Sequence, residues 1–457
     1  MSSCLVRLAF AAGLTLPAAS VSAQGFGIYE QGTCVMARGG AGVAQPCADG
    51  SAIFINPAGL TASQGWIITG GATLIRGSGT FTADQGPVTS SEVAKGAPPP
   101  HLYLVNKVND KLAVGFGTFV PYGLRIQWPI DFAGRFITYD SSLTTVYLQP
   151  TIAYAVTPSI SIGAGVTIAR GSVELNRRED LARVPLGATG LTFGALVDSQ
   201  TDFENTMLSA SGAWGAGANL GAIVKASEQL RFGVRYLTHV KLHYSGSATF
   251  TPIAGTFRVT KPNPLGFPVG APLNALVAVA QAALQSQPAS TDIEMPAQLV
   301  AGTSVSATDR LTLFADYQWV QWSSFDSVVL NFSTGVPPSE VLPQNFHNTS
   351  AVRLGAQYDL NSMWRVSGGY IHNQAAAPDE NVTPFLPDAA RNQFTAGVGW
   401  TPHPKLTVDV AYQFIAYDDR RGRIVNPPPG TAPSTALNSG VYRSRADLIG
   451  LTLTFRP

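Results

Sequence analysis

Long segments in which apolar and polar residues alternate are the feature that most constrains this chain. In KLTVDVAYQFIAY (405–417), one face consists of Leu406, Val408, Val410, Tyr412 and Phe414, and the other of Thr407, Asp409, Ala411 and Gln413. SISIGAGVTIA (159–169) alternates in the same way. A period of two indicates strands with one apolar and one polar face, so the sequence predicts an all-β fold.

Fourteen such segments follow the first 65 residues. We place them near 66–75, 100–108, 110–122, 142–156, 159–175, 207–224, 229–245, 293–306, 310–323, 347–359, 362–373, 391–401, 404–418 and 441–455. Short turns such as Pro402-His403-Pro404 alternate with long loops along the chain. Short turns on one rim and long loops on the other are typical of a transmembrane antiparallel β-barrel, whereas a soluble β-sandwich has no reason to segregate them.

The N-terminus resembles a secretory signal peptide covering residues 1–23. It carries Arg7, an apolar stretch from Leu8 to Leu16, and the small-residue site Val21-Ser22-Ala23. Charged residues make up only 12% of the chain, yet no later run of about 20 apolar residues could form a spanning helix. An exported chain of this kind fits a barrel in the bacterial outer membrane, because closed barrels satisfy their backbone groups in lipid.

Charge and cysteine content exclude several functions. The 29 basic and 28 acidic residues nearly balance, which gives no reason to expect a nucleic-acid partner. Cys4 leaves with the signal peptide, so Cys34 and Cys47 either form a disulfide or remain as two thiols. His239 and His243 would lie about 13 Å apart on a strand, too far for one metal ion. We expect no metal site and no cofactor.

Residues 24–65 alternate poorly and precede the barrel, which we place at 66–457. In SAIFINPAGLT (51–61), Pro57 forces a turn, and we expect residues 24–65 to fold inside the lumen as a plug, or hatch. A helix expected at 272–287 lies in a long loop and either captures hydrophobic ligand or simply packs on its neighbours. Aromatic residues near strand ends favour interfacial girdles: Tyr317, Trp319, Trp322, Trp364, Tyr370, Trp400 and Tyr417.

Several stretches in order make the whole mature chain resemble the FadL/TodX family of outer-membrane transporters for hydrophobic compounds. They are GF (25–26), RGGAGVA (38–44), the NPA motif (Asn56, Pro57, Ala58), LTLFADYQWVQWSSFDS (311–327), PDENVTPFLPDAARNQFTAGVGW (378–400) and the closing SGVYRSRADLIGLTLTF. The resemblance implies a monomeric fourteen-stranded barrel with an N-terminal hatch. It also implies passive uptake of long-chain fatty acids or aromatic hydrocarbons. Such a barrel would be inserted by the barrel-assembly machinery and surrounded by outer-membrane lipid and lipopolysaccharide.

The resemblance also implies site residues. A kink in the third strand, through which ligand would leave sideways, matches Pro121, Tyr122 and Gly123, although these residues could instead simply end the strand. The N-terminus beside the luminal ligand would be Gln24, Gly25 and Phe26. Candidate carboxylate contacts are Arg170, Arg177 and Arg178, none of which matches a family position, so neutral hydrocarbons remain open as substrates.

Two other functions fit the sequence less well. A lipid-active barrel enzyme would need a nucleophile with a histidine base, and the sequence contains no Gly-x-Ser-x-Gly elbow. A general porin for polar solutes is disfavoured by the plug. We therefore predict no catalytic residues. We predict a transporter that captures hydrophobic compounds at its external loops, with long-chain fatty acids as the favoured substrates, and releases them from a luminal site sideways through the kinked third strand.

Overall fold

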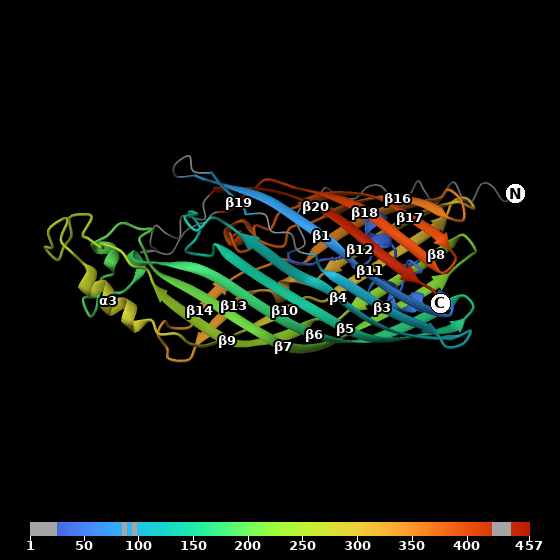
Figure 1. Ribbon diagram of the computed structural model, residues 1–457, viewed down its shortest axis with the longest axis horizontal. Helices are drawn as coiled ribbons and strands as arrows, with labels where there is room; N and C mark the ends of the chain where they lie inside the picture. Colours follow the sequence, from blue (N-terminus) through green and yellow to red (C-terminus); the bar gives the residue numbers. More distant parts are fainter. Residues whose placement is uncertain (1–24, 85–88, 94–97, 423–439) are drawn as a thin grey trace.

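A closed antiparallel barrel forms the body of the protein in a computed structural model that describes residues 25–84, 89–93, 98–422 and 440–457 (Figure 1). The predicted signal peptide and Gln24 lie outside these ranges. The wall strands are β1 (Trp66–Ala83), β3 (Pro100–Lys107), β4 (Leu112–Gln127), β5 (Asp140–Thr157), β6 (Ile160–Asp180), β7 (Asp202–Lys225), β8 (Leu230–Leu237), β9 (Val240–Pro252), β10 (Gln287–Met295), β11 (Gln298–Ser306), β12 (Leu311–Val320), β15 (Thr349–Asp359), β16 (Trp364–Asn373), β17 (Arg391–His403), β18 (Leu406–Tyr417) and β20 (Gly440–Phe455).

The wall has 14 strands, as predicted, because β8 with β9 and β10 with β11 are halves of single wall strands. The ring closes where β1 pairs with β20, from Ile68 opposite Phe455 to Ala83 opposite Gly440. The short turns gather at one end with the C-terminus, and the long loops gather at the other (Figure 1). Among the described helices, none is long and apolar enough to cross a membrane.

Smaller elements occupy the loops and the lumen. The short strands are β2 (Thr89–Ser91), β13 (Ser327–Phe332), β14 (Glu340–Pro343) and β19 (Arg420–Gly422). The helices are α1 (Thr33–Ala37), α2 (Ala52–Ile55), α3 (Asn274–Ala283), η1 (Pro57–Ala62), η2 (Leu181–Arg183), η3 (Phe193–Ala195), η4 (Trp322–Ser324) and η5 (Asp379–Asn381). The expected loop helix is thus present as α3. It buries Val277 against the outer loops and leaves Leu276 and Val279 exposed.

The two faces of the wall follow the alternation. Outward residues such as Val410 and Tyr412 are 48% and 45% exposed, whereas the inward Asp409 and Gln413 are buried. Ile162, Val166 and Ile168 face outward in the same way. An apolar outer band of this kind is what a barrel presents to lipid.

Several sequence expectations need correction. The third strand does not end at Tyr122 but continues as β4 to Gln127. The predicted strands 229–245 and 293–306 are each interrupted, at 238–239 and 296–297. Trp322 and Tyr417 do not belong to an outer girdle. β12 ends at Val320, and the chain then turns inward and buries Trp322. Tyr417 occupies one of the alternate positions of β18 that face inward, and it lines the lumen.

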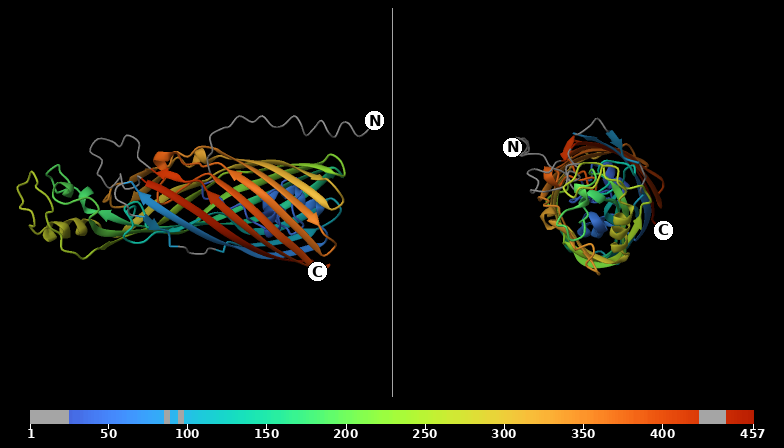
Figure 2. Two further views of the ribbon diagram at one scale, coloured as in Figure 1. Left: turned by 90° about the horizontal axis from the view of Figure 1, so that it is seen from above. Right: turned by 90° about the vertical axis from the view of Figure 1, so that its left-hand side faces the viewer.

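Residues 25–65 lie inside the ring of strands, where Figure 2 shows them in blue. Their helices α1 and α2 are wholly buried, and the wall begins directly afterwards at Trp66. Apolar side chains of the hatch, such as Val35 and Ile53, join the luminal core. The hatch therefore fills the end of the lumen that carries the short turns and leaves the loop end to the cavities described below.

Candidate functional site: a hatch, a wall gap and two cavities

The NPA motif anchors the hatch to the wall. Asn56 is completely buried, and its Nδ2 donates to the carbonyl oxygens of Val43 (2.7 Å), Ala222 (3.1 Å) and Val234 (3.2 Å). Its Oδ1 accepts from the Ala58 N–H, which caps η1 at the turn that Pro57 begins. The motif thus joins two parts of the hatch to β7 and β8, and it holds the fold together without facing a cavity.

Close packing around this motif depends on wall glycines. A Cβ on Gly221 would lie 2.0 Å from Asn56 Oδ1, and one on Gly163 would lie 2.4 Å from the Ala58 nitrogen. A Cβ on Gly233 would lie 2.2 Å from the Val43 carbonyl oxygen. Distances below 3.0 Å leave no room for a side chain, so these inward glycines let the hatch backbone touch the wall.

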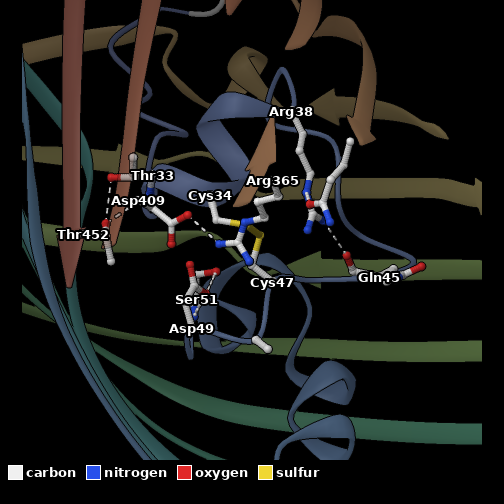
Figure 3. Close-up of a disulfide and its surroundings, with 12 residues drawn as sticks. Thr33, Cys34, Arg38, Gln45, Cys47, Asp49, Ser51, Arg365, Asp409 and Thr452 are labelled. Atoms are coloured by element: carbon white, nitrogen blue, oxygen red, sulfur yellow. Dashed lines mark hydrogen bonds and ion pairs between the residues drawn. A yellow bond between two sulfur atoms is a disulfide. The ribbon is translucent and has the colours of Figure 1, made fainter. Parts of the chain in front are cut away.

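A disulfide joins Cys34 of α1 to Cys47, with their Cα atoms 6.3 Å apart (Figure 3). Nearby, Thr452 of β20 donates to the Thr33 hydroxyl at 2.7 Å and thereby docks α1 on the wall. Asp49 lies close enough to the two sulfur atoms to resemble a metal site. Because both cysteines are in the disulfide, the cluster offers no thiolate ligand.

Buried charges hold the rest of the hatch. Asp316 of β12 accepts from the N–H groups of Gly42 (2.8 Å) and Val43 (2.9 Å). The Arg353 guanidinium lies 3.8 Å from the centre of the Tyr29 ring, and that of Arg235 lies 4.5 Å from the Phe54 ring. Cations over aromatic faces are favourable away from water, so these contacts fix the middle of the hatch.

The N-terminal segment pairs with β4 as a short strand would. The Ile28 N–H donates to the Pro121 carbonyl (2.8 Å), and the Gly123 N–H donates to the Phe26 carbonyl (3.0 Å). Gly27 lies opposite Tyr122 in an antiparallel bridge. The structure therefore brings together Gly25, Phe26 and the Pro121-Tyr122-Gly123 stretch, which the sequence had singled out separately.

Phe26 is held in an aromatic box. Its ring centroid lies 4.9 Å from that of Trp322, 5.3 Å from Phe325 and 6.1 Å from Tyr122, always edge to face. Tyr122 is fixed in turn, because its hydroxyl donates to the Pro296 carbonyl and accepts from Gln298. Edge-to-face aromatic pairs contribute about 0.5–1.5 kcal/mol each beyond burial, so these contacts hold the Phe26 ring in one position.

Asp388, in the loop before β17, fastens the residue before Phe26. Its Oδ1 accepts from the Gly25 N–H (3.1 Å), and its Oδ2 accepts from Ala376 (2.5 Å) and Ala377 (2.9 Å). Burial raises the pKa of this carboxyl, and the two alanine N–H groups oppose that rise. A loop from the far side of the sequence thus holds the N-terminal segment against β4.

The ladder between β3 and β4 stops early. β4 pairs with β3 only from Ala113 to Thr118, whereas it pairs with β5 up to Gln127, with a register shift between Phe119 and Tyr122. Farther along, Glu92 and Val93 rejoin the two sides, because their N–H groups donate to Gly79 of β1 and Gln127 of β4. Between these points the described residues 98–101 form no strand pairs with β4, and residues 94–97 lie outside the described ranges. Residues 26–28 cover the edge of β4 from Pro121 to Gly123 from inside.

A cavity of about 680 Å³ coincides with this wall gap. On the luminal side it is lined by Phe26, Arg391 and Gln393. It also reaches Leu102 and Thr144, which are exposed on the outer face. Glu92 lies at its rim, where burial raises the pKa of the carboxyl to about 7. We call this space the wall cavity.

Arg391 is a lining residue that sequence reasoning missed. Its Nη1 donates to the Tyr417 hydroxyl (3.2 Å), its Nε is buried without a partner, and none of the ion pairs between described residues includes it. The signal was present in the sequence: Arg391 shares its parity with Gln393 and Thr395, which face inward. A cation that forms no close ion pair with a described residue therefore faces a mostly apolar cavity, which the carboxylates of Glu30 and Asp388 also line.

A second cavity of about 490 Å³, the mouth cavity, lies nearer the long loops and is lined by Val173, Leu208, Leu330 and Arg177. Arg177 is already paired with Glu179 and Glu340, both at 2.8 Å.

The other two predicted arginines lie elsewhere. The Arg170 guanidinium is outside the barrel, 5.6 Å from the Trp214 ring centre, and Arg178 lies 3.9 Å from Asp202 on the face of β6 opposite to Arg177. Of the three predicted carboxylate contacts, only Arg177 lines the wall cavity or the mouth cavity, and both of its partners are carboxylates.

A closed barrel with an apolar outer band, an anchored hatch and a wall gap beside a luminal cavity defines a plugged outer-membrane channel. The chain belongs to the outer membrane protein transport protein family (OMPP1/FadL/TodX), whose model matches residues 14–456. It is therefore a transporter of hydrophobic compounds across the outer membrane and not an enzyme.

Individual relatives are distant but cover at least 90% of the chain. The outer membrane protein P1 of Haemophilus influenzae is 25% identical and covers 97% of this chain and 98% of its own length. The long-chain fatty acid transport protein of Escherichia coli K12 is 20% identical and covers 90% and 91%. Among solved structures, a Pseudomonas aeruginosa FadL homologue has a TM-score of 0.79 at 20% identity, covering 94% and 99%. The Pseudomonas putida toluene transporter TodX has a TM-score of 0.66 at 18% identity, covering 95% and 98%.

Proposed function

We propose that this transporter carries long-chain fatty acids passively, from the mouth cavity to the wall cavity, and releases them sideways through the gap between β3 and β4. The observation that carries the proposal is the wall cavity itself, which extends from luminal residues such as Gln393 to the outer-face residue Thr144. A cavity of a few hundred Å³ with mainly apolar lining suits a small hydrophobic ligand.

The surroundings of Arg391 support the proposal that the ligand carries an anionic headgroup. Its Nε lacks a hydrogen-bond partner among the described residues and it takes part in none of their ion pairs, although the carboxylates of Glu30 and Asp388 act on its charge from the same cavity. Apolar residues such as Ile415 and Leu448 also line this side. A carboxylate placed there would gain a charge-assisted hydrogen bond, and its alkyl chain would lie against apolar side chains. Arg177 supports this role less well, since Glu179 and Glu340 already neutralise it.

The covering segment supplies the gate. Residues 26–28 make two backbone hydrogen bonds to β4 and seat one ring, Phe26, in the aromatic box. A ligand that displaces Phe26 would replace ring contacts with its own apolar contacts and would leave the edge of β4 open. Binding of the ligand would therefore open the wall gap directly, and transport would require no energy source.

Replacement of Arg391 by Met tests the substrate class. The variant keeps the length of the side chain and removes its charge, so we expect binding of a long-chain fatty acid to weaken by about 10- to 100-fold, the value of one charge-assisted hydrogen bond. Binding of toluene, which has no carboxylate, should change little. Arg231→Met, at the short-turn rim, is the matched control.

Native mass spectrometry of the purified barrel would measure both ligands. Equal weakening for toluene and fatty acid would indicate general damage to the cavity, and an unchanged fatty-acid affinity would remove Arg391 from the site. Toluene bound well by a native protein that ignores fatty acids would make aromatic hydrocarbons the substrate class.

A further inference from the structure

Three arginines form a patch on the outer face of the barrel where β1 pairs with β20, a strand junction that we call the β1–β20 seam: Arg76, Arg443 and Arg445. On β20, Arg443 and Arg445 face outward like Ile449, Leu451 and Leu453, and Arg76 occupies an outward position of β1. All three arginines are exposed, Arg443 with 56% of its side chain. Arg443 lies opposite Thr80, and Arg445 lies opposite Ser78, two residues from Arg76. Neighbours two residues apart or diagonal across a ladder are about 7–8 Å apart, so Arg445 lies at that distance from both Arg76 and Arg443, whereas Arg76 and Arg443 are offset by four residues, about 14 Å. Arg445 can therefore share an anion with either neighbour, and a lipid that carries two phosphates can contact all three.

The patch lies at the upper edge of the apolar band. Arg76 is ten residues from Trp66, the first residue of β1, and Arg445 is ten residues from Phe455, the last residue of β20. At about 3.4 Å per residue and a tilt of about 40°, ten residues rise about 26 Å, close to the roughly 25 Å height of the lipid-facing band of a barrel. The arginines therefore lie at the level of the headgroups on the side that carries the long loops.

The patch carries a net positive charge, because three arginines face two carboxylates, Asp419 and Asp447, among the described residues. Arg443 pairs with Asp419 (2.8 Å), but neither Arg76 nor Arg445 takes part in any ion pair between described residues. Among the described residues, the Arg445 Nε donates to the Ser78 hydroxyl (3.2 Å). Asp447, directly opposite Arg76, accepts instead from the Tyr412 hydroxyl. Crowded guanidinium groups repel one another, and an external anion would remove that cost.

We propose that this patch binds the phosphate groups of a phosphorylated glycolipid of the outer leaflet, lipopolysaccharide. Guanidinium groups match phosphate oxygens with paired hydrogen bonds, and the acyl chains of the lipid would lie on Ile449 and Leu451 directly below. Charge complementarity and position select this occupant: a soluble anion would gain nothing from the apolar wall beneath the arginines.

The same height on the other side of the barrel provides a contrast. Arg170 is ten residues from Ile160, the first residue of β6, but it stands alone and its guanidinium lies over Trp214. It lacks neighbours that could share a phosphate. Arg170→Ser is therefore the matched control for loss of one interfacial arginine.

Binding of lipid A to the full chain in detergent, followed by native mass spectrometry, tests the proposal. The native chain should prefer bisphosphorylated lipid A to lipid A without phosphates by at least about tenfold, given about 1 kcal/mol for each basic residue near an anionic surface. The triple variant R76S/R443S/R445S should lose this preference, the triple lysine variant should keep most of it, and Arg170→Ser should keep it. Heat-modifiable gel mobility would confirm assembly.

The lipid preference of the native chain is measured without any variant, so it can overturn the proposal even if the triple serine variant fails to assemble. No preference for the phosphorylated lipid would overturn the proposal. Equal losses in Arg170→Ser and the triple serine variant would also overturn it, as would full competition by millimolar inorganic phosphate, which would indicate a site for the free ion. Arg445 also touches the wall cavity, so binding rather than uptake is the appropriate measurement.

Discussion

Two seams of one barrel wall behave differently. The β1–β20 seam pairs without a break from Ile68 to Ala83, and neither strand contains proline. In the part of the chain that the structure describes, β3 pairs with β4 only up to Thr118, and Pro121 follows within β4. Proline has no N–H to donate, so a ladder cannot run through it unchanged. The first seam closes the barrel permanently, whereas hatch residues 26–28 cover the second, and a short segment can be displaced more easily than a wall strand.

Removal of the hatch segment that covers the edge of β4 should have the largest effect. Deletion of residues 24–55 takes away the segment on β4 and most of the hatch while leaving the β1–β20 seam and every other wall pair intact. We expect the shortened barrel to insert and to conduct ions at least about tenfold better, because a fourteen-stranded lumen without its plug is wide enough for water. Planar-bilayer conductance measures this. A truncated barrel no more conductive than the full chain would mean that the hatch does not occlude the lumen.

Filling the wall gap should have the next largest effect. A Cβ on Gly123 would lie 3.0 Å from Ile28 Cδ1 and 3.7 Å from the Leu143 carbonyl, so Gly123→Ala needs a small shift and Gly123→Arg must occupy the gap. We expect uptake of labelled fatty acid to fall slightly in the first variant and by at least about tenfold in the second, with assembly preserved because the ladder is already broken there.

A matched control comes from the neighbouring outer face. Gly70 of β1 faces outward on the parity of Ile68, and a Cβ there would have only Leu102 within 4 Å. Gly70→Arg adds the same side chain to the lipid-facing side of the wall, where an arginine costs about 2–4 kcal/mol at the bilayer midplane, so heat-modifiable gel mobility must first confirm assembly. The assembled variant should leave uptake close to normal. Full uptake by a folded Gly123→Arg protein would mean that the ligand leaves by another route, such as downward past the hatch.

Loss of the hatch disulfide should have the smallest effect. Replacement of Cys34 and Cys47 by Ala removes a cross-link whose loop contributes about 3 kcal/mol in the chain-entropy model. The expected result is faster hydrogen exchange in residues 33–47, with no change in the wall strands. Thr33 and Asn56 keep their own contacts to the wall, so the hatch should remain seated. Equal exchange in both proteins would show that these contacts suffice.

The strands could be predicted from the sequence because each carries its own period-two pattern, and that pattern also gave the faces of β6 and β18. Pro121 marked a disturbance in β4 without showing that the strand continues beyond it. Trp322 was misplaced because β12 loses its alternation at Val320, where the chain turns inward.

Long-range partners were out of reach of a single sequence. The hydrogen bond between Gly25 and Asp388 spans 363 residues, and nothing local to either residue indicates it. Arg391 stood inside a recognised stretch, but its lack of a close ion pair with a described residue is a property of the folded lumen. The three predicted arginines were chosen by nearness along β6, where alternation sends Arg170 outward and Arg177 inward.

A reversible lock on the β4 edge tests the central claim most directly. Gly27 and Tyr122 face each other between the two flanking backbone hydrogen bonds, an arrangement with Cα atoms about 4.5 Å apart that suits a disulfide. In the variant Gly27→Cys/Tyr122→Cys, uptake of labelled fatty acid into cells would be measured before and after mild reduction, with Tyr122→Cys alone as the control. We predict negligible uptake in the oxidised state and recovery on reduction to the level of the control. Undiminished uptake with the lock closed would contradict a route that requires residues 26–28 to leave β4.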